Sequence, residues 1–190
     1  MKKLTHLLIL LSAFNAYSQS YAYEPNEEFP YGRLNPDAPE QVGDFQGLIG
    51  DCNCKSVSRI SQSEWADTVN MRWTFKYIMN GTAVQDMTLK EDGIHSGSIR
   101  QYNADSLRWY VHYYSSSVAT PTLSAWEGNK IDDGTIVLRR DQVAPNGMAG
   151  KYRLTFSNIS EEGYDWAGEW VDTSETIIYP TWRIFCKRTD

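Results

Sequence analysis

The stretch from Val69 to Met79 reads VNMRWTFKYIM, and its pattern decides the fold class. Every odd-numbered position carries an apolar or aromatic side chain, whereas Arg72, Thr74 and Lys76 occupy even-numbered positions. Successive side chains of a β-strand point to opposite faces, so this alternation predicts a strand with one apolar face. We therefore expect a β-sheet that packs this face into a core.

The same alternation recurs after residue 45, between pairs of residues that favour turns. Asn-Gly and Asp-Gly pairs favour hairpin turns because both residues accept positive φ angles. They occur at positions 80–81, 92–93, 133–134 and 146–147. The clearest further strands are predicted at 107–114, 151–156 and 164–170, with weaker ones at 46–60, 82–90, 94–102, 122–128, 134–142 and 176–187. After residue 45 the sequence shows no sustained helical period, which predicts an all-β fold.

About ten short strands in simple succession predict an antiparallel up-and-down barrel of about 8–10 strands over residues 45–190. Closure of the barrel removes the exposed edges that an open meander would have. A barrel of this size is wide enough to hold one small ligand. Residues 19–44 carry prolines without a periodic pattern, which predicts an extended N-terminal segment across the barrel surface. A short helical turn is expected at 39–45, because proline is tolerated at a helix start.

Residues 1–18 have the layout of a secretory signal peptide. Two lysines precede an apolar stretch over Leu4–Ala16. A small-x-small pattern then suits cleavage after Ser18, and cleavage after Ser20 is an alternative. The apolar stretch is shorter than the roughly 20 residues that span a bilayer, so an uncleaved anchor is the weaker interpretation. We expect export through the Sec pathway to the periplasm or outside the cell, with no membrane span after cleavage.

The three cysteines, Cys52, Cys54 and Cys186, predict one disulfide. An exported protein can form disulfides, and an odd count leaves one thiol over. Cys52 and Cys54 are two residues apart on a predicted strand, a separation of about 6.5–7 Å that disfavours a bond between them. One of them is expected to bond Cys186. Cys54 and Cys186 are the candidate pair, and a bond between Cys52 and Cys186 is the alternative.

Composition and motifs argue against several function classes. The net charge of −6 and the sequence pI of about 5.1 argue against general nucleic-acid binding, which needs a basic face. The sequence has no Gly-x-Ser-x-Gly elbow, no phosphate-binding glycine loop and no His-Glu-x-x-His motif. His95 and His112 are the only histidines after the signal peptide, too few to complete a zinc site with the cysteines. We expect no metal and no cofactor.

From Pro39 onward the chain resembles a domain-of-unknown-function family of bacterial exported proteins with a lipocalin-like (calycin-type) barrel. The resemblance covers about 150 residues and rests on aromatic strands and hairpins. The matching segments are Pro39-Glu40-Gln41, Phe45, Leu48-Ile49-Gly50, residues 73–77, residues 80–86, residues 98–103, Trp109, Trp126-Glu127-Gly128, residues 156–159 and Cys186-Lys187-Arg188. The resemblance implies a barrel with a cavity and brings no assigned reaction. Many members carry Trp at the position of Cys52, so cysteine pairing is a local feature of this chain.

Aromatic residues make up 13% of the chain, which fits a barrel that lines both a core and a pocket wall. A small-molecule site is usually an apolar cavity with a few convergent polar groups. The candidate ligand-binding residues are therefore aromatic or polar residues on predicted strands: Trp73, Asp86, Arg100, Tyr102, Trp109, His112, Trp166 and Trp182. Arg139 and Arg183 are further polar candidates. Asp86 and Arg100 are expected to form an ion pair inside the barrel. The sequence leaves two positions for His112, lining the lumen or pointing to solvent.

The function expected from these observations is binding of a small apolar or aromatic ligand by an exported barrel. A structural or envelope-interaction barrel without ligand is the first alternative, and a cavity below about 300 Å³ would favour it. A cyclase or isomerase that uses the lumen is the second alternative. It would need Asp86, His112 or a tyrosine as its acid or base. No catalytic residue is assigned.

Overall fold

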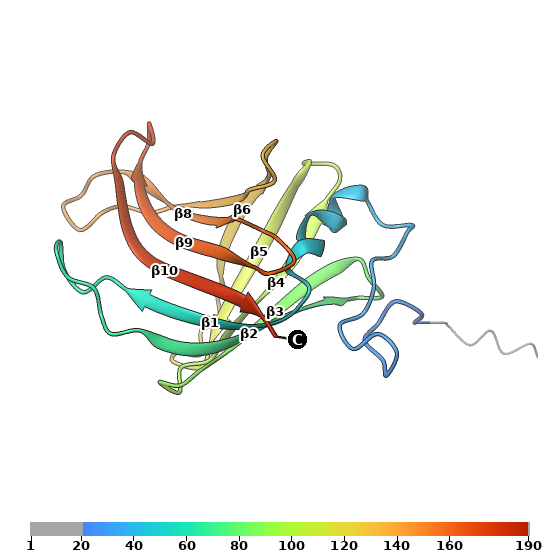
Figure 1. Ribbon diagram of the computed structural model, residues 1–190. Coiled ribbons are helices and arrows are strands. Elements are labelled where there is room, and N and C mark those ends of the chain that lie inside the picture. Colours follow the sequence, from blue (N-terminus) through green and yellow to red (C-terminus); the bar gives the residue numbers. More distant parts are fainter. Residues whose placement is uncertain (1–20, 190) are drawn as a thin grey trace, which may run out of the picture.

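The computed structural model describes residues 21–189, which contain a closed barrel of ten antiparallel strands (Figure 1). Consecutive strands pair with each other, and the first strand pairs with the last. The predicted all-β, up-and-down barrel is thereby confirmed, and the architecture is consistent with a lipocalin-like fold. Because the sheet closes on itself, each of these strands has a partner on both sides.

Each strand corresponds to an apolar–polar alternation between two turns. The strands are β1 (Gly50–Ser58), β2 (Val69–Ile78), β3 (Ala83–Lys90), β4 (Ser96–Asn103), β5 (Arg108–Ser115), β6 (Ser124–Lys130), β7 (Ile136–Asp141), β8 (Gly150–Ser157), β9 (Gly163–Asp172) and β10 (Ile178–Arg188). On β2 the alternation is clearest, because Trp73 and Phe75 are buried while Arg72 is exposed. The apolar face predicted from the sequence is thus the face that turns into the barrel.

A disulfide joins the two strands that close the barrel. Cys54 on β1 lies opposite Cys186 on β10 and is bonded to it, which confirms the candidate pair. The two cysteines are 132 residues apart in the sequence, so the bond links the first strand to the last. Cys52 is left as a buried free thiol. A disulfide is typical of proteins in oxidising compartments.

A short helix closes one end of the barrel. This 3-10 helix, η1 (Glu40–Leu48), lies on the right in Figure 1 and extends beyond the turn predicted at 39–45. Phe45 is completely buried and packs edge-on against Trp109, with ring centroids 4.7 Å apart. The Trp109 indole N–H donates to the Asp44 carboxylate at 3.0 Å. One end of the lumen is therefore filled by side chains of η1.

Residues 21–39 contain no helix or strand and run across the same end of the barrel. The backbone N–H of Asn35 donates to the carbonyl of Gly81, in the β2–β3 turn, at 3.1 Å. Gly81 has a φ angle of +78°, and a Cβ added there would lie 2.3 Å from the carbonyl oxygen of Arg33. Glycine is therefore required at this turn both by the backbone conformation and by the close approach of the N-terminal segment.

The predicted signal peptide, residues 1–18, and the alternative cleavage site after Ser20 lie outside the described residues. The extended segment expected at 19–44 is described from residue 21, and its last part belongs to η1. Across residues 21–189 no helix has the length and apolar character needed to span a membrane.

Candidate functional site

The half of the barrel away from η1 contains a cavity of about 240 Å³. Side chains from strands β2 to β10 line it, and η1 contributes none. Half-buried residues such as Lys90, Tyr113 and Tyr152 lie at its open end. The volume is below the range of about 300–1,000 Å³ that is usual for small-molecule sites, so an occupant must be small.

Three of the candidate tryptophans, Trp73, Trp166 and Trp182, form one wall of this cavity. The Trp166 and Trp182 rings meet edge to face with centroids 5.1 Å apart, and Trp73 lies 6.3 Å from Trp166. The Trp182 indole N–H donates to the hydroxyl of Ser56 at 2.8 Å. Edge-to-face contacts stabilise aromatic pairs by about 0.5–1.5 kcal/mol beyond burial, so this wall presents fixed ring surfaces to the lumen.

The predicted ion pair between Asp86 and Arg100 is present inside the barrel. Both residues are 3% exposed. One Asp86 carboxylate oxygen accepts from Arg100, and the other accepts from the Trp73 indole N–H at 2.7 Å. The Arg100 guanidinium also lies over the rings of Phe75 and Phe45, at 4.9 and 5.2 Å from their centroids. Because both oxygens of Asp86 have donors, this carboxylate holds the wall together and is poorly placed to act as a free base.

A second polar group in the cavity wall consists of Trp126 on β6 and Arg140 on β7. The Arg140 guanidinium lies 4.4 Å from the centroid of the Trp126 ring and 5.8 Å from that of Tyr152. Its Nη2 donates to the side chain of Gln142 at 3.2 Å. The buried Nε of Arg140 and the buried Nε1 of Trp126 have no hydrogen-bond acceptor among the described residues. These two donors are left for solvent or for a ligand.

Arg140 and Trp126 lie where β6 and β7 separate. Toward the open end of the barrel, the last paired residues of the two strands are Glu127 and Arg139. Beyond that pair the strands diverge, and Arg140 and Trp126 line a groove on the outer surface as well as the cavity. The cavity and the outer groove therefore meet at these two side chains.

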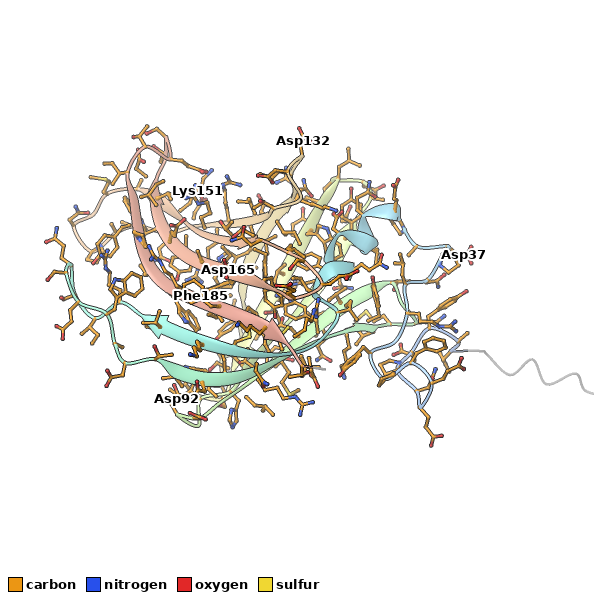
Figure 2. The ribbon with its side chains drawn as sticks, in the orientation of Figure 1. Asp37, Asp92, Asp132, Lys151, Asp165 and Phe185 are labelled. Carbon is orange, nitrogen blue, oxygen red and sulfur yellow. A yellow bond between two sulfur atoms is a disulfide. The ribbon has the colours of Figure 1, made fainter. Side chains whose placement is uncertain are left out.

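The remaining cation in the cavity lining is Lys90, and it is already paired. Its Nζ lies 2.6 Å from the carboxylate of Asp92 and 5.8 Å from the centroid of the Trp182 ring. The hydrogen bond from Lys90 lowers the pKa of Asp92, which favours the ionised carboxylate. Figure 2 shows Asp92 at the end of the barrel away from Asp37 in the N-terminal segment. Lys90 thus has its counter-ion beside it.

Three of the candidate residues lie apart from the cavity. Tyr102 and Trp109 turn inward near η1, where their rings pack edge to face at 5.7 Å. His112 lies between the lining residues Val111 and Tyr113 on β5, so it occupies the outer face of the strand. The candidates that do line the cavity are Trp73, Asp86, Arg100, Trp166 and Trp182.

The free thiol of Cys52 lies at the closed end and outside the cavity. Burial raises the pKa of the Cys52 thiol, which keeps it protonated at neutral pH. Burial also raises the pKa of the neighbouring Tyr164 well above its ordinary value. A thiol is a nucleophile only as the thiolate, so this cysteine has the properties of a core residue.

Within residues 21–189 no group of three His, Cys, Asp or Glu side chains is placed to hold a metal ion. No protein-family model matches the chain, and no curated protein matches its sequence. The fold and the chemistry of the cavity are therefore the basis for assigning a function.

Proposed function

We propose that the protein is an exported barrel that binds one small apolar or aromatic molecule in its lumen. The observation that carries the proposal is the asymmetry of the lumen. Side chains of η1 fill one half, whereas the other half holds a cavity of about 240 Å³ walled by tryptophan rings. Protein cores are close-packed and rarely contain voids larger than a water molecule, so a hollow of this size is a feature of binding proteins.

The volume of the cavity is the one observation that favours a barrel without ligand, because it is below the usual range. The lining favours binding. A core that serves only stability is apolar, whereas this wall contains the charged side chains of Lys90, Arg100 and Arg140. The small volume therefore limits the size of the ligand to about that of a short chain or a one- or two-ring molecule.

The location proposed for the protein, outside the cytosol, rests on two supports. The first is the disulfide between Cys54 and Cys186. The second is the resemblance to exported proteins with a lipocalin-like barrel, together with the sequence pattern of residues 1–18.

Intrinsic tryptophan fluorescence, titrated with a panel of short fatty acids, haem and aromatic molecules, tests the proposal. We expect a saturable change with at least one small member of the panel, because Trp73, Trp166 and Trp182 line the cavity. Ser98→Phe places a ring in the lumen and is expected to weaken binding by at least about tenfold, equivalent to about 1.4 kcal/mol.

The matched control is Ile99→Phe, which introduces the same ring at the next residue of β4, outside the cavity lining. Its affinity should equal that of the unsubstituted protein. Absence of a saturable change with every member of the panel would contradict the proposal. Equal binding by the Ser98 and Ile99 variants would place the ligand outside the lumen.

A further inference from the structure

We propose that the ligand is a small organic carboxylate, and that Arg140 and the indole N–H of Trp126 bind its charged group. This inference rests on the proposed function of the lumen and specifies the chemical class of the molecule bound there. It follows from the charges that line the cavity, from the unpaired donors in its wall, and from the place where those donors lie.

The charges that line the cavity do not balance. Arg100 is neutralised by Asp86 inside the barrel, and Lys90 is neutralised by Asp92 at the open end. Arg140 forms no salt bridge with any carboxylate of the described residues. One positive charge in the cavity wall is therefore left without a counter-ion, and it favours an anionic ligand.

Three buried donors of the cavity lining lack acceptors within residues 21–189, and one of them belongs to Arg100, whose charge Asp86 already neutralises. Trp126 is only 7% exposed, and its Nε1 has no partner among the described residues. The Nε of Arg140 is likewise buried and unpaired. An indole N–H and a guanidinium can only donate, so the group that satisfies both must be an acceptor. An ionised carboxylate offers two acceptor oxygens and makes charge-assisted hydrogen bonds with such donors.

The place of these donors fits an acid with an apolar body. The Arg140 guanidinium is stacked on the Trp126 ring at 4.4 Å, which holds it at the edge of the cavity where β6 and β7 separate. The opposite wall consists of the tryptophan rings of β2, β9 and β10. A molecule with its carboxylate on Arg140 would therefore place its body against Trp166 and Trp182.

The number of donors favours a carboxylate over a phosphate group. A phosphate monoester carries close to two negative charges at neutral pH and three acceptor oxygens. Among the described residues the cavity lining offers one guanidinium without a counter-ion, that of Arg140, and one indole N–H, since Lys90 is engaged by Asp92 and Arg100 by Asp86. A single negative charge is the amount that Arg140 can neutralise.

Isothermal titration calorimetry with two matched series tests the inference. The first series is hydrocinnamate, hydrocinnamyl alcohol and hydrocinnamylamine, and the second is octanoate, octanol and octylamine. Within each series the body is constant and the head group is anionic, neutral or cationic. We expect the acid to bind about tenfold or more tightly than the alcohol, and the amine to bind most weakly, as charge-assisted hydrogen bonds imply.

Two variants show whether the named donors cause this preference. Arg140→Gln keeps a polar donor on a shorter side chain but removes the charge, and it should weaken binding of the acid about tenfold to a hundredfold while leaving the alcohol nearly unchanged. Trp126→Phe keeps an aromatic ring, although a smaller one, and removes the N–H, and it should weaken binding of the acid by a smaller factor. The control Lys55→Gln removes an exposed charge on β1, away from the cavity and from the groove of Arg140, and should leave both affinities unchanged.

The outcomes separate this inference from the proposed function. Binding of alcohols as tightly as acids, or an acid preference that survives in Arg140→Gln, would overturn the carboxylate assignment while leaving lumen binding intact. Failure of both complete series and of the fluorescence panel to bind would overturn both. Equal losses for acid and alcohol in Arg140→Gln, with lowered thermal stability, would show that Arg140 only supports the wall.

Discussion

Replacement of Asp86 by alanine is expected to destabilise the protein by about 3–5 kcal/mol, because it leaves the buried Arg100 guanidinium without its counter-ion. The same change removes the acceptor of the Trp73 indole N–H. Since small domains are stable by only about 5–15 kcal/mol, this loss is a large part of the total. Urea unfolding followed by circular dichroism measures it as a fall in the midpoint concentration.

The exposed pair between Arg108 and Glu127 provides the matched control for Asp86. Its side chains are 44% and 49% exposed and lie 2.8 Å apart. Exposed ion pairs contribute about 0–1 kcal/mol, so Glu127→Ala should leave the midpoint almost unchanged. The double variant Asp86→Leu with Arg100→Met should recover part of the loss, since it removes both buried charges together. If Asp86→Ala costs no more than Glu127→Ala, the pair is not buried as described.

Removal of the disulfide is expected to cost about 4–5 kcal/mol. The bond between Cys54 and Cys186 closes a loop of 132 residues, and a cross-link over so long a loop greatly restricts the unfolded chain. The change to make is Cys54→Ala with Cys186→Ala, in a Cys52→Ala background so that no thiol is left to exchange. Urea unfolding compares it with Cys52→Ala alone.

The control for the disulfide is the effect of a reducing agent. Reduction should lower the unfolding midpoint of Cys52→Ala and leave the variant without cysteines unchanged. Chemical labelling of the free thiols shows whether reduction of Cys52→Ala is complete. If it is complete and the unfolding midpoint does not change, the contribution assigned to this bond is contradicted. A disulfide between Cys52 and Cys186, found by peptide mapping of the unsubstituted protein, would contradict the pairing itself.

The strands could be predicted from the sequence because their pattern is local. The alternation in Val69–Met79 and the Asn-Gly and Asp-Gly turns are visible without knowledge of the rest of the chain. Closure of the barrel could be predicted from the same pattern, since a meander of hairpins must protect its two edge strands. The pairing of Cys54 with Cys186 then placed the first strand beside the last.

The inner face of each strand was harder to predict, because several strands carry aromatic side chains on both faces. On β5 both alternating sets of side chains contain aromatic residues, so the outward position of His112 depends on the register with β4 and β6.

On β7 three consecutive apolar residues, 136–138, hide the period of two. Arg139, a candidate from the sequence, pairs with Glu175 at 2.6 Å and does not line the cavity, whereas Arg140 does. Arg140 has the same parity as Ile136 and Leu138, which are both completely buried, but the apolar run hides this parity in the sequence.

The most direct test of ligand binding in the lumen is NMR spectroscopy of the seven tryptophan indole N–H groups in ¹⁵N-labelled protein, titrated with hydrocinnamate. The account predicts saturable shifts for Trp126, Trp166 and Trp182, which line the cavity, and no shift for Trp109, which is bonded to Asp44 at the closed end. The Trp126 signal should move furthest, because its N–H gains an acceptor. Indole signals that stay unchanged with hydrocinnamate, octanoate and the rest of the panel, or that shift only at Trp109, would contradict it.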